Sequence, residues 1–283
     1  MKGKPGAGYA HVVKRESLLG LDWITQNEVM NHHLEKMINR VELSEEESLV
    51  SDLKTRYGEV FSDGLGRCTK EKAELITKPD VTPVCRRSRP LPYTSKESVE
   101  KELDRLIELD VIRPVNYAKW AAPIVVVKKA NGKLRICTDF STGLNKALED
   151  YQFPLPVPED IFACLDGGKV FSQVDLSDAY LQVELTDEAK EKVVVSTHRG
   201  FYQYNRLPFG IKTAPAIFQN IMFKMTSGMN GVATYLDDII ITGKTVEEHN
   251  DNLKKLFERI AEYGFKVRLE KCSFLTTETM FLG

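Results

Sequence analysis

Two adjacent aspartates, Asp237 and Asp238, lie inside the stretch "VATYLDDIIITG" (residues 232–243), between two runs of apolar and β-branched residues. Neighbouring side chains on a strand point to opposite faces, but at a hairpin turn both carboxylates can reach the same side. Two carboxylates this close oppose each other's ionisation, unless a bound divalent cation reverses the local balance of charge. The pair therefore indicates a metal site, and the alternative interpretation is an ordinary exposed turn.

A third carboxylate, Asp175, ends the apolar run "VFSQV" (170–174). If that run is a strand that pairs with the hairpin at 232–243, the three aspartates converge. Two cations roughly 4 Å apart could then activate an attacking oxygen and hold a leaving pyrophosphate. Mg²⁺ suits such a site because it uses few carboxylates and leaves positions for water and phosphate oxygens.

The elements that must position these aspartates can be read from residue 169 onward. After the strand that ends at Asp175, the sequence predicts a strand pair, a helix, the 232–243 hairpin, a second helix and closing strands. The strand pair is "KVVVST" with "FYQYNRLPF", and the closing strands are "KVRLEKCSFL" and "TMFLG". The first helix is expected to be capped by Thr213, with Pro215 in its first turn. The second helix, at 246–263, has a capping box of Thr245 and Glu248 and ends at Gly264. The order β-α-β-β-α-β is the split βαβ pattern and predicts an α+β fold.

Upstream of residue 169, a helix is expected at 95–109, begun by a capping box of Thr94 and Glu97. The stretch "APIVVVKKANGKLRICTDF" (122–140) reads as a hairpin turning at Asn131-Gly132. Seven basic residues and a single acid occupy 113–146, which suits a surface that faces phosphates; the alternative is a solvated hairpin.

Composition places the chain among ordinary globular proteins, with 283 residues, net charge −2 and 42% hydrophobic residues. No apolar run approaches the roughly 20 residues that cross a bilayer, and the N-terminus has no apolar signal region, so an intracellular protein without membrane contact is expected. Five cysteines without a C-x-x-C pair argue against a disulfide framework or a structural zinc site.

Several motifs then occur in the order found in one family. They are "KKANGKLRICTDF", "LNKAL", "VDLSDAYLQV", "RLPFGIKTAPAIFQN", "YLDD" and the terminal "FLG". Over about residues 90–283 the chain resembles the reverse transcriptases of Gypsy-type LTR retrotransposons, within the retroviral-type Pol polyproteins. The resemblance implies an RNA-directed DNA polymerase, a nucleotidyltransferase with a palm of ferredoxin-like βαββαβ form and an interwoven fingers subdomain.

The resemblance also implies roles for individual residues. Asp175, Asp237 and Asp238 would be catalytic and, with the Leu176 carbonyl, would hold two Mg²⁺ ions, for which Mn²⁺ can substitute. The predicted nucleotide-binding residues are Lys129, Arg135, Asp178, Ala179, Tyr180, Phe209 and Gly210. Tyr180 would exclude ribonucleotides by its ring, and the alternative interpretation for it is a core aromatic. Tyr235 and Gly283 would contact primer and template, and the partners would be a primed RNA or DNA template and a dNTP.

The resemblance divides the chain as follows: a remnant of a retropepsin-like protease C-terminus at 1–40, on "LLGLDWI"; a connector at 41–95; fingers at 96–148 and 183–213; and palm at 149–182 and 214–283. No D-[ST]-G protease motif is present. The thumb would lie beyond Gly283, so weak or no processive synthesis is expected. Ser141-Thr142-Gly143 replaces the common pattern with Arg before L-N, which leaves that template contact open. The expected location is the cytoplasm, in a virus-like particle.

Two other functions stay open at this stage. The first is a non-catalytic, polymerase-derived module that binds nucleic acid or protein. The second is an RNA-dependent RNA polymerase, against which Tyr180 and the "LPFG" stretch argue. Incorporation of dNTP, compared with rNTP, distinguishes these functions.

Overall fold

A computed structural model describes residues 44–128 and 134–278 of the chain. The chain divides into two units, Met1–Ser48 and Leu49–Gly283, and nearly all described residues belong to the second. The protease remnant predicted at 1–40 lies outside the described residues.

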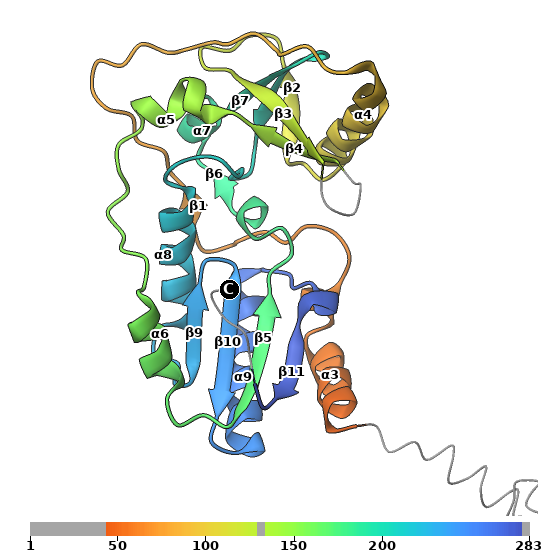
Figure 1. Cartoon of the computed structure of the whole chain (residues 1–283), viewed down its shortest axis with the longest axis vertical. Coiled ribbons are helices and arrows are strands. Elements are labelled where there is room, and N and C mark those ends of the chain that lie inside the picture. The colour runs from red at the N-terminus through yellow and green to blue at the C-terminus, as the bar shows by residue number, and fades with distance from the viewer. Residues whose placement is uncertain (1–43, 129–133, 279–283) are drawn as a thin grey trace, which may run out of the picture. The chain divides into compact units, whose positions relative to one another are not determined.

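One sheet carries both aspartate-bearing segments. Its four strands run in the order β11-β5-β10-β9, and every pairing is antiparallel (Figure 1). The strands are β5 (Val170–Asp175), β9 (Val232–Tyr235), β10 (Asp238–Gly243) and β11 (Ser273–Thr276). With α8 (Ala214–Thr226) and α9 (Val246–Tyr263), the chain order is β5-α8-β9-β10-α9-β11. The predicted βαββαβ palm is therefore confirmed as a fold.

The two long helices of this half bury the faces that their spacing predicts. Leu253, Leu256, Phe257 and Ile260 of α9 are buried, as are Ile217, Phe218, Ile221 and Met222 of α8. The capping box of α9 is present, because the Thr245 hydroxyl accepts from the Glu248 amide. Gly264 ends the helix with φ +75, a conformation that glycine adopts without a Cβ penalty.

Two predicted helix caps are wrong. Thr213 precedes α8, but its hydroxyl caps nothing and has no partner among the described atoms. The helix predicted at 95–109 is α4 (Tyr93–Glu108), and its N-cap is Pro92. Thr94 therefore lies inside the first turn, where its side chain cannot accept from the N3 amide as an N-cap does.

The second sheet has five strands in the order β2-β8-β7-β3-β4. They are β2 (Ile112–Val115), β3 (Ala122–Lys128), β4 (Leu134–Thr138), β7 (Val194–Thr197) and β8 (Gly200–Tyr204). The predicted hairpins β3–β4 and β7–β8 are both present. The pairing of β3 with β7 is parallel and joins the two hairpins into one sheet.

The remaining described elements are α3 (Glu45–Arg56), η1 (Gly58–Phe61), β1 (Lys72–Ala73), η2 (Phe140–Thr142), α5 (Leu144–Ala147), α6 (Pro158–Leu165), η3 (Ala179–Gln182), β6 (Glu184–Leu185), α7 (Asp187–Lys190) and η4 (Leu269–Lys271). Of these, β1 and β6 pair in parallel as a two-stranded sheet. The strand predicted across 266–275 is interrupted by η4, so only its second part pairs as β11. "TMFLG" (279–283) lies outside the described residues.

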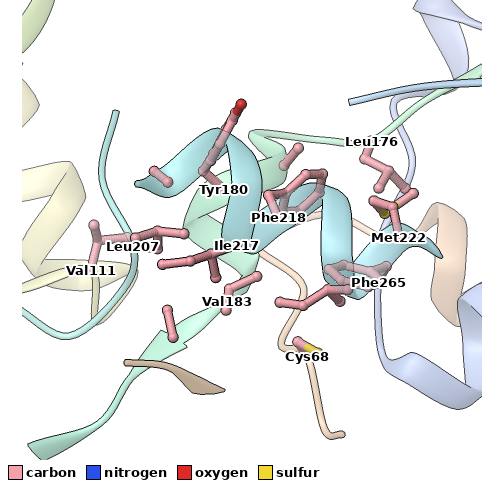
Figure 2. Close-up of a cluster of buried hydrophobic side chains, with 14 of the residues drawn as sticks. Cys68, Val111, Leu176, Tyr180, Val183, Leu207, Ile217, Phe218, Met222 and Phe265 are labelled. Atoms are coloured by element: carbon pink, nitrogen blue, oxygen red, sulfur yellow. The ribbon is translucent and has the colours of Figure 1, made fainter. Parts of the chain in front are cut away.

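The segment that follows Asp175 is anchored in the core. Figure 2 shows Tyr180 and Val183 near Phe218 and Ile217 of α8, and Leu176 near Met222 of the same helix. The apolar side of this segment thus packs on α8. No described helix is long and apolar enough to cross a membrane.

Candidate active site

The register of two strands brings the predicted aspartates together. In the β5–β10 ladder Asp175 lies directly opposite Asp238, and paired residues of antiparallel strands have Cα atoms roughly 4.5–5.5 Å apart. Asp237 precedes Asp238 in the two-residue turn between β9 and β10. The predicted pairing of the 170–175 strand with the hairpin is therefore confirmed.

A cavity of about 280 Å³ lies in front of two of these carboxylates. It is lined from the four-stranded half by Asp175, Leu176, Asp178, Ala179, Leu181, Asp237, Arg268 and Lys271, and from the other half by Glu102, Arg105, Leu106, Ile136, Cys137, Thr138, Tyr204, Pro208 and Phe209. Six predicted site residues thus share one cavity. Asp238, Tyr180, Gly210 and Tyr235 are not among its lining residues.

The Asp238 carboxylate is hydrogen-bonded by a neighbouring side chain. Its Oδ1 accepts a hydrogen bond from Gln173 Nε2 at 3.1 Å, and Gln173 lies on the same face of β5 as Asp175. Among the residues that the structure describes, no group of three or more His, Cys, Asp or Glu side chains is already spaced to hold a metal ion. Two carboxylates face the cavity, and the third is engaged by an amide beside it.

Basic side chains lie next to the aspartates of the cavity. Lys271 Nζ is 3.4 Å from Asp175 Oδ2, and Arg268 is 3.4 Å from Asp178 Oδ2. Burial nevertheless raises the pKa of Asp175 above its ordinary value; Lys271 and Arg268 oppose this rise, and the nearby Asp237 adds to it. The negative charge at Asp175 is thus incompletely compensated by the chain's own groups.

The ring of Tyr180 packs in the hydrophobic core. The ring lies 4.7 Å from Phe209 and 4.9 Å from Phe218, measured between centroids, and Figure 2 shows the hydroxyl at the end of the side chain that points away from Phe218. Burial raises the Tyr180 pKa to about 12, and the charge of Asp237 contributes to the shift. The packing favours the core interpretation for the ring, while the nearby Asp237 places its hydroxyl end at the edge of the site.

Gly210 makes a close approach to the five-stranded sheet. Its φ is +94, and a Cβ there would lie 3.0 Å from the carbonyl oxygen of Thr138. Asn145 Nδ2 donates to its carbonyl oxygen at 2.8 Å. Glycine is thus required at this position for conformation and for space.

Both turns that carry the aspartates contain a strained residue. Asp178 has φ +48 and Leu236 has φ +55, and a non-glycine residue in such a region costs on the order of 1–3 kcal/mol. Leu236 is the first of two turn residues and Asp237 is not left-handed, which is the pattern of a type II′ turn, where glycine is usual. The turn that follows Asp175 is hydrogen-bonded to the segment before η4. Arg268 N donates to the Asp175 carbonyl, and Ser177 N donates to the Lys266 carbonyl.

Several residues at the site are missing from the sequence prediction. They are the basic pair Arg268 and Lys271, the Glu102–Arg105 ion pair of α4, and two buried glutamines, Gln182 and Gln219. The glutamines had a signal in the sequence, since each interrupts an apolar run, in "AYLQVEL" and "AIFQNIMF". Of the predicted cationic residues, the β4 strand places Arg135 opposite Val127, and Lys129 lies outside the described residues, as does Gly283.

Comparisons with known proteins concern the family of the chain and its fold. The family model described as "Reverse transcriptase (RNA-dependent DNA polymerase)" matches residues 127–283. The chain is 52% identical to the uncharacterized protein K02A2.6 of Caenorhabditis elegans, over 100% of this chain and 23% of that protein. It is 30% identical to the retrovirus-related Pol polyprotein from transposon 412 of Drosophila melanogaster, over 83% of this chain and 21% of the polyprotein. The chain thus spans less than a quarter of the length of these curated relatives.

Solved structures share the fold. A foamy viral protease-reverse transcriptase in complex with double-stranded DNA matches with TM-score 0.77 and 24% identity, covering 89% of this chain and 45% of that one. The corresponding complex with an RNA/DNA hybrid matches with the same score and identity, over 34% of its chain.

Proposed function

Because the chain belongs to the reverse transcriptase family, we propose that it adds deoxynucleotides to the 3′-OH of a primer paired to an RNA or DNA template. The observation that carries the proposal is the β5–β10 register, which sets Asp175 opposite Asp238 beside a cavity that Asp237 also lines. Family membership and the palm fold were both expected from the ordered motifs. The reaction needs positioning and charge neutralisation more than covalent help from the protein.

Asp175, Asp237 and Asp238, with the Leu176 carbonyl, would hold two Mg²⁺ ions. The donor set fits, because all four groups offer the hard oxygen ligands that Mg²⁺ prefers. The Lys271 ammonium 3.4 Å from Asp175 marks a position that accepts positive charge, and the raised pKa of Asp175 means that a cation there would stabilise the ionised form. When bound, such ions activate the attacking oxygen and neutralise charge on the phosphates. Asp238 would have to exchange its hydrogen bond with Gln173 for a metal.

The remaining roles follow from the same family. Asp178, Ala179 and Phe209 line the cavity and would contact the incoming dNTP, with Gly210 close behind them. Lys129 and Arg135 would bind the triphosphate, Tyr180 would disfavour a ribose 2′-OH, and Tyr235 and Gly283 would contact primer and template. The β3–β4 sheet would be the fingers (96–148 and 183–213), and the βαββαβ half the palm (149–182 and 214–283), reached through the connector at 41–95. The location proposed for the full polyprotein is a cytoplasmic particle.

The test is single-nucleotide addition to a labelled primer on an RNA or a DNA template, with Mg²⁺ or Mn²⁺. The wild-type chain should extend the primer by the complementary dNTP, with much less extension by the matching rNTP. Asp237→Asn should abolish extension while leaving the thermal unfolding temperature nearly unchanged. Equal extension by Asp237→Asn and the wild type would falsify the proposal.

The bond between Asp238 and Gln173 favours a second candidate, a module that binds primed template without catalysis. In that case the wild type and Asp237→Asn would bind a fluorescent primer–template equally, and neither would extend it with either metal ion.

A further inference from the structure

Two buried glutamine side chains contact the two turns that carry the aspartates. Gln182, at the end of η3, is 0% exposed, and Gln219, in α8, is 2% exposed. A buried amide is stable only when its donors and its acceptor are satisfied, and each of these side chains makes three hydrogen bonds. Neither side chain lines the cavity, so their bonds are directed at the protein's own turns.

Gln182 links the turn after Asp175 to the neighbouring segment that contains Lys266. Its Nε2 donates to the carbonyls of Ser177 at 2.7 Å and Lys266 at 2.9 Å, and its Oε1 accepts from Lys266 N at 2.7 Å. The turn contains Asp178 with φ +48. Space for the amide is provided by Gly66, where a Cβ would lie 1.9 Å from Gln182 Oε1.

Gln219 makes the corresponding bonds at the other turn. Its Nε2 donates to the Thr234 carbonyl at 3.1 Å and to the Thr234 hydroxyl at 3.3 Å. Its Oε1 accepts from the amide of Leu236 at 2.7 Å. Leu236 is the left-handed residue immediately before Asp237, so this bond fixes the strained residue itself.

From this correspondence we infer that Gln182 and Gln219 are positioning residues, which hold the two left-handed turns so that Asp175 and Asp237 face the same cavity. The inference rests on the proposed function, since it assigns the glutamines to the metal-binding geometry of that site. Without its glutamine, each turn loses hydrogen bonds that oppose relaxation toward a more favourable φ, and the carboxylate beside it would move with the backbone. A misplacement of about 1 Å at a reacting centre can cost on the order of 100-fold in rate.

A third buried amide offers a matched control. Asn205 Nδ2 donates to the Asp110 carbonyl at 3.3 Å and to its Oδ1 at 2.7 Å. Asp110 is also left-handed, with φ +52, but it belongs to the turn between α4 and β2, which carries none of the proposed metal ligands. Asn205→Leu therefore removes the same kind of contact at a turn unrelated to the carboxylates.

The test compares Gln219→Met and Gln182→Met, which keep the approximate shape of the side chain but cannot form these hydrogen bonds, with Asn205→Leu. Three quantities are measured: exchange of the Leu236 and Lys266 amide hydrogens, Mn²⁺ affinity by electron paramagnetic resonance, and kcat and KM for one dNTP. Each Met variant should speed exchange of its own amide at least tenfold, weaken Mn²⁺ binding about tenfold and lower kcat about 100-fold, with KM nearly unchanged. Asn205→Leu should lower the unfolding temperature and leave Mn²⁺ affinity and kcat within about twofold.

Leu236→Gly provides a rescue that a merely structural role would not show. Because glycine adopts positive φ without penalty, the double variant Gln219→Met/Leu236→Gly should recover most of the Mn²⁺ affinity lost in Gln219→Met. If Gln219→Met does not fold, Gln182→Met tests the same inference at the other turn.

The outcomes distinguish failure of the positioning role from failure of the proposed function. If the wild type binds Mn²⁺ and adds nucleotides, but the Met variants lose only stability, as Asn205→Leu does, the positioning role is refuted and the proposed function stands. If the wild type neither binds Mn²⁺ through Asp237 nor adds nucleotides, the proposed function fails and the positioning role fails with it.

Discussion

Two carboxylates in the two halves of the molecule have similarly exposed side chains but opposite pKa shifts. Asp175 ends β5 of the four-stranded sheet, and Asp139 follows β4 of the five-stranded sheet. Their side chains are 17% and 23% exposed, and each lies within ion-pair distance of a basic side chain, Lys271 or Arg89. The pKa of Asp175 is nevertheless raised and that of Asp139 is lowered.

The two pKa shifts differ because hydrogen bonds and ion pairs stabilise the Asp139 carboxylate more fully than the Asp175 carboxylate. The hydroxyl of Ser141 donates to Asp139, and together with Arg89 it outweighs the effect of burial on the Asp139 pKa. At Asp175 burial is the largest effect, Lys271 only partly offsets it, and Asp237 adds a like charge. Asp139 is therefore a satisfied structural carboxylate, whereas burial and the neighbouring Asp237 disfavour the ionised form of Asp175.

The largest expected effect is a loss of catalytic rate, and it should distinguish Asp175 from Asp139. Asp175→Asn should lower the rate of single-nucleotide addition by about 1000-fold, because metal ligation contributes several kcal/mol to the transition state, and should leave the free energy of unfolding unchanged or higher. Asp139→Asn should keep the rate within about tenfold and lose on the order of 1 kcal/mol of stability. Kinetics and urea denaturation on the same preparations measure both quantities, and equal losses of rate would contradict the distinction.

The next effect is on stability and compares the strands that carry the two regions. Ile239 of β10 is fully buried, whereas Val126 of β3 is only partly buried. Ile239→Ala should cost about 2–5 kcal/mol through lost burial and a cavity, and Val126→Ala about 1 kcal/mol or less. Urea denaturation measures both, and a larger loss at Val126 would show that the five-stranded sheet is the more constrained region.

A smaller effect is expected for the cationic residue of the β3–β4 hairpin. Arg135→Ala should raise KM for dNTP about tenfold, equivalent to roughly 1.4 kcal/mol of lost binding, with a smaller change in kcat. The reason is that a guanidinium that binds phosphate contributes to the ground state and the transition state alike. Steady-state kinetics with varied dNTP concentration tests this. A fall in kcat at constant KM would instead place Arg135 with the carboxylates.

The smallest effect is a pH dependence located in the four-stranded half. His249 is fully buried on α9, with Nε2 2.8 Å from Ser172 Oγ, and burial lowers its pKa from the ordinary 6.5. As pH falls below 6.5 the unfolded chain binds this proton before the folded chain does. Stability is therefore present above that pH and is lost as pH falls toward the lower folded pKa, by at most about 1.4 kcal/mol per pH unit.

Thermal unfolding between pH 7.5 and pH 5.5 tests the role of His249. His249→Gln should flatten the pH dependence relative to the wild type. Parallel slopes in the two proteins would exclude His249 as the source.

The sequence was informative where the pattern of apolar residues alone determines the structure. The β-branched runs that flank Asp237 and follow Lys169 allow few arrangements other than buried strands, and their pairing was predicted from the position of the carboxylates. Helices α8 and α9 were predicted because their apolar faces repeat at helical spacing. These features depend on burial, which a single sequence encodes strongly.

Features that depend on backbone angles were predicted less well. The caps assigned to Thr94 and Thr213 were wrong, because a cap requires a particular entry angle of the chain, and Pro92 begins α4 earlier than expected. The bonds of Gln182 and Gln219 connect segments that are 84 and 17 residues apart, and nothing in the local pattern specifies such partners. The direction of Asp238 toward Gln173 likewise depends on the register of the strands.

The central claim is that Asp175 and Asp237 hold divalent cations at the floor of one cavity. The most direct measurement is anomalous diffraction at the manganese edge from crystals of the chain soaked in Mn²⁺ with a dNTP. Peaks are expected within coordination distance of both carboxylates, and they should be absent in Asp237→Asn. Saturated crystals with Mn²⁺ bound elsewhere, and none between these two side chains, would contradict it.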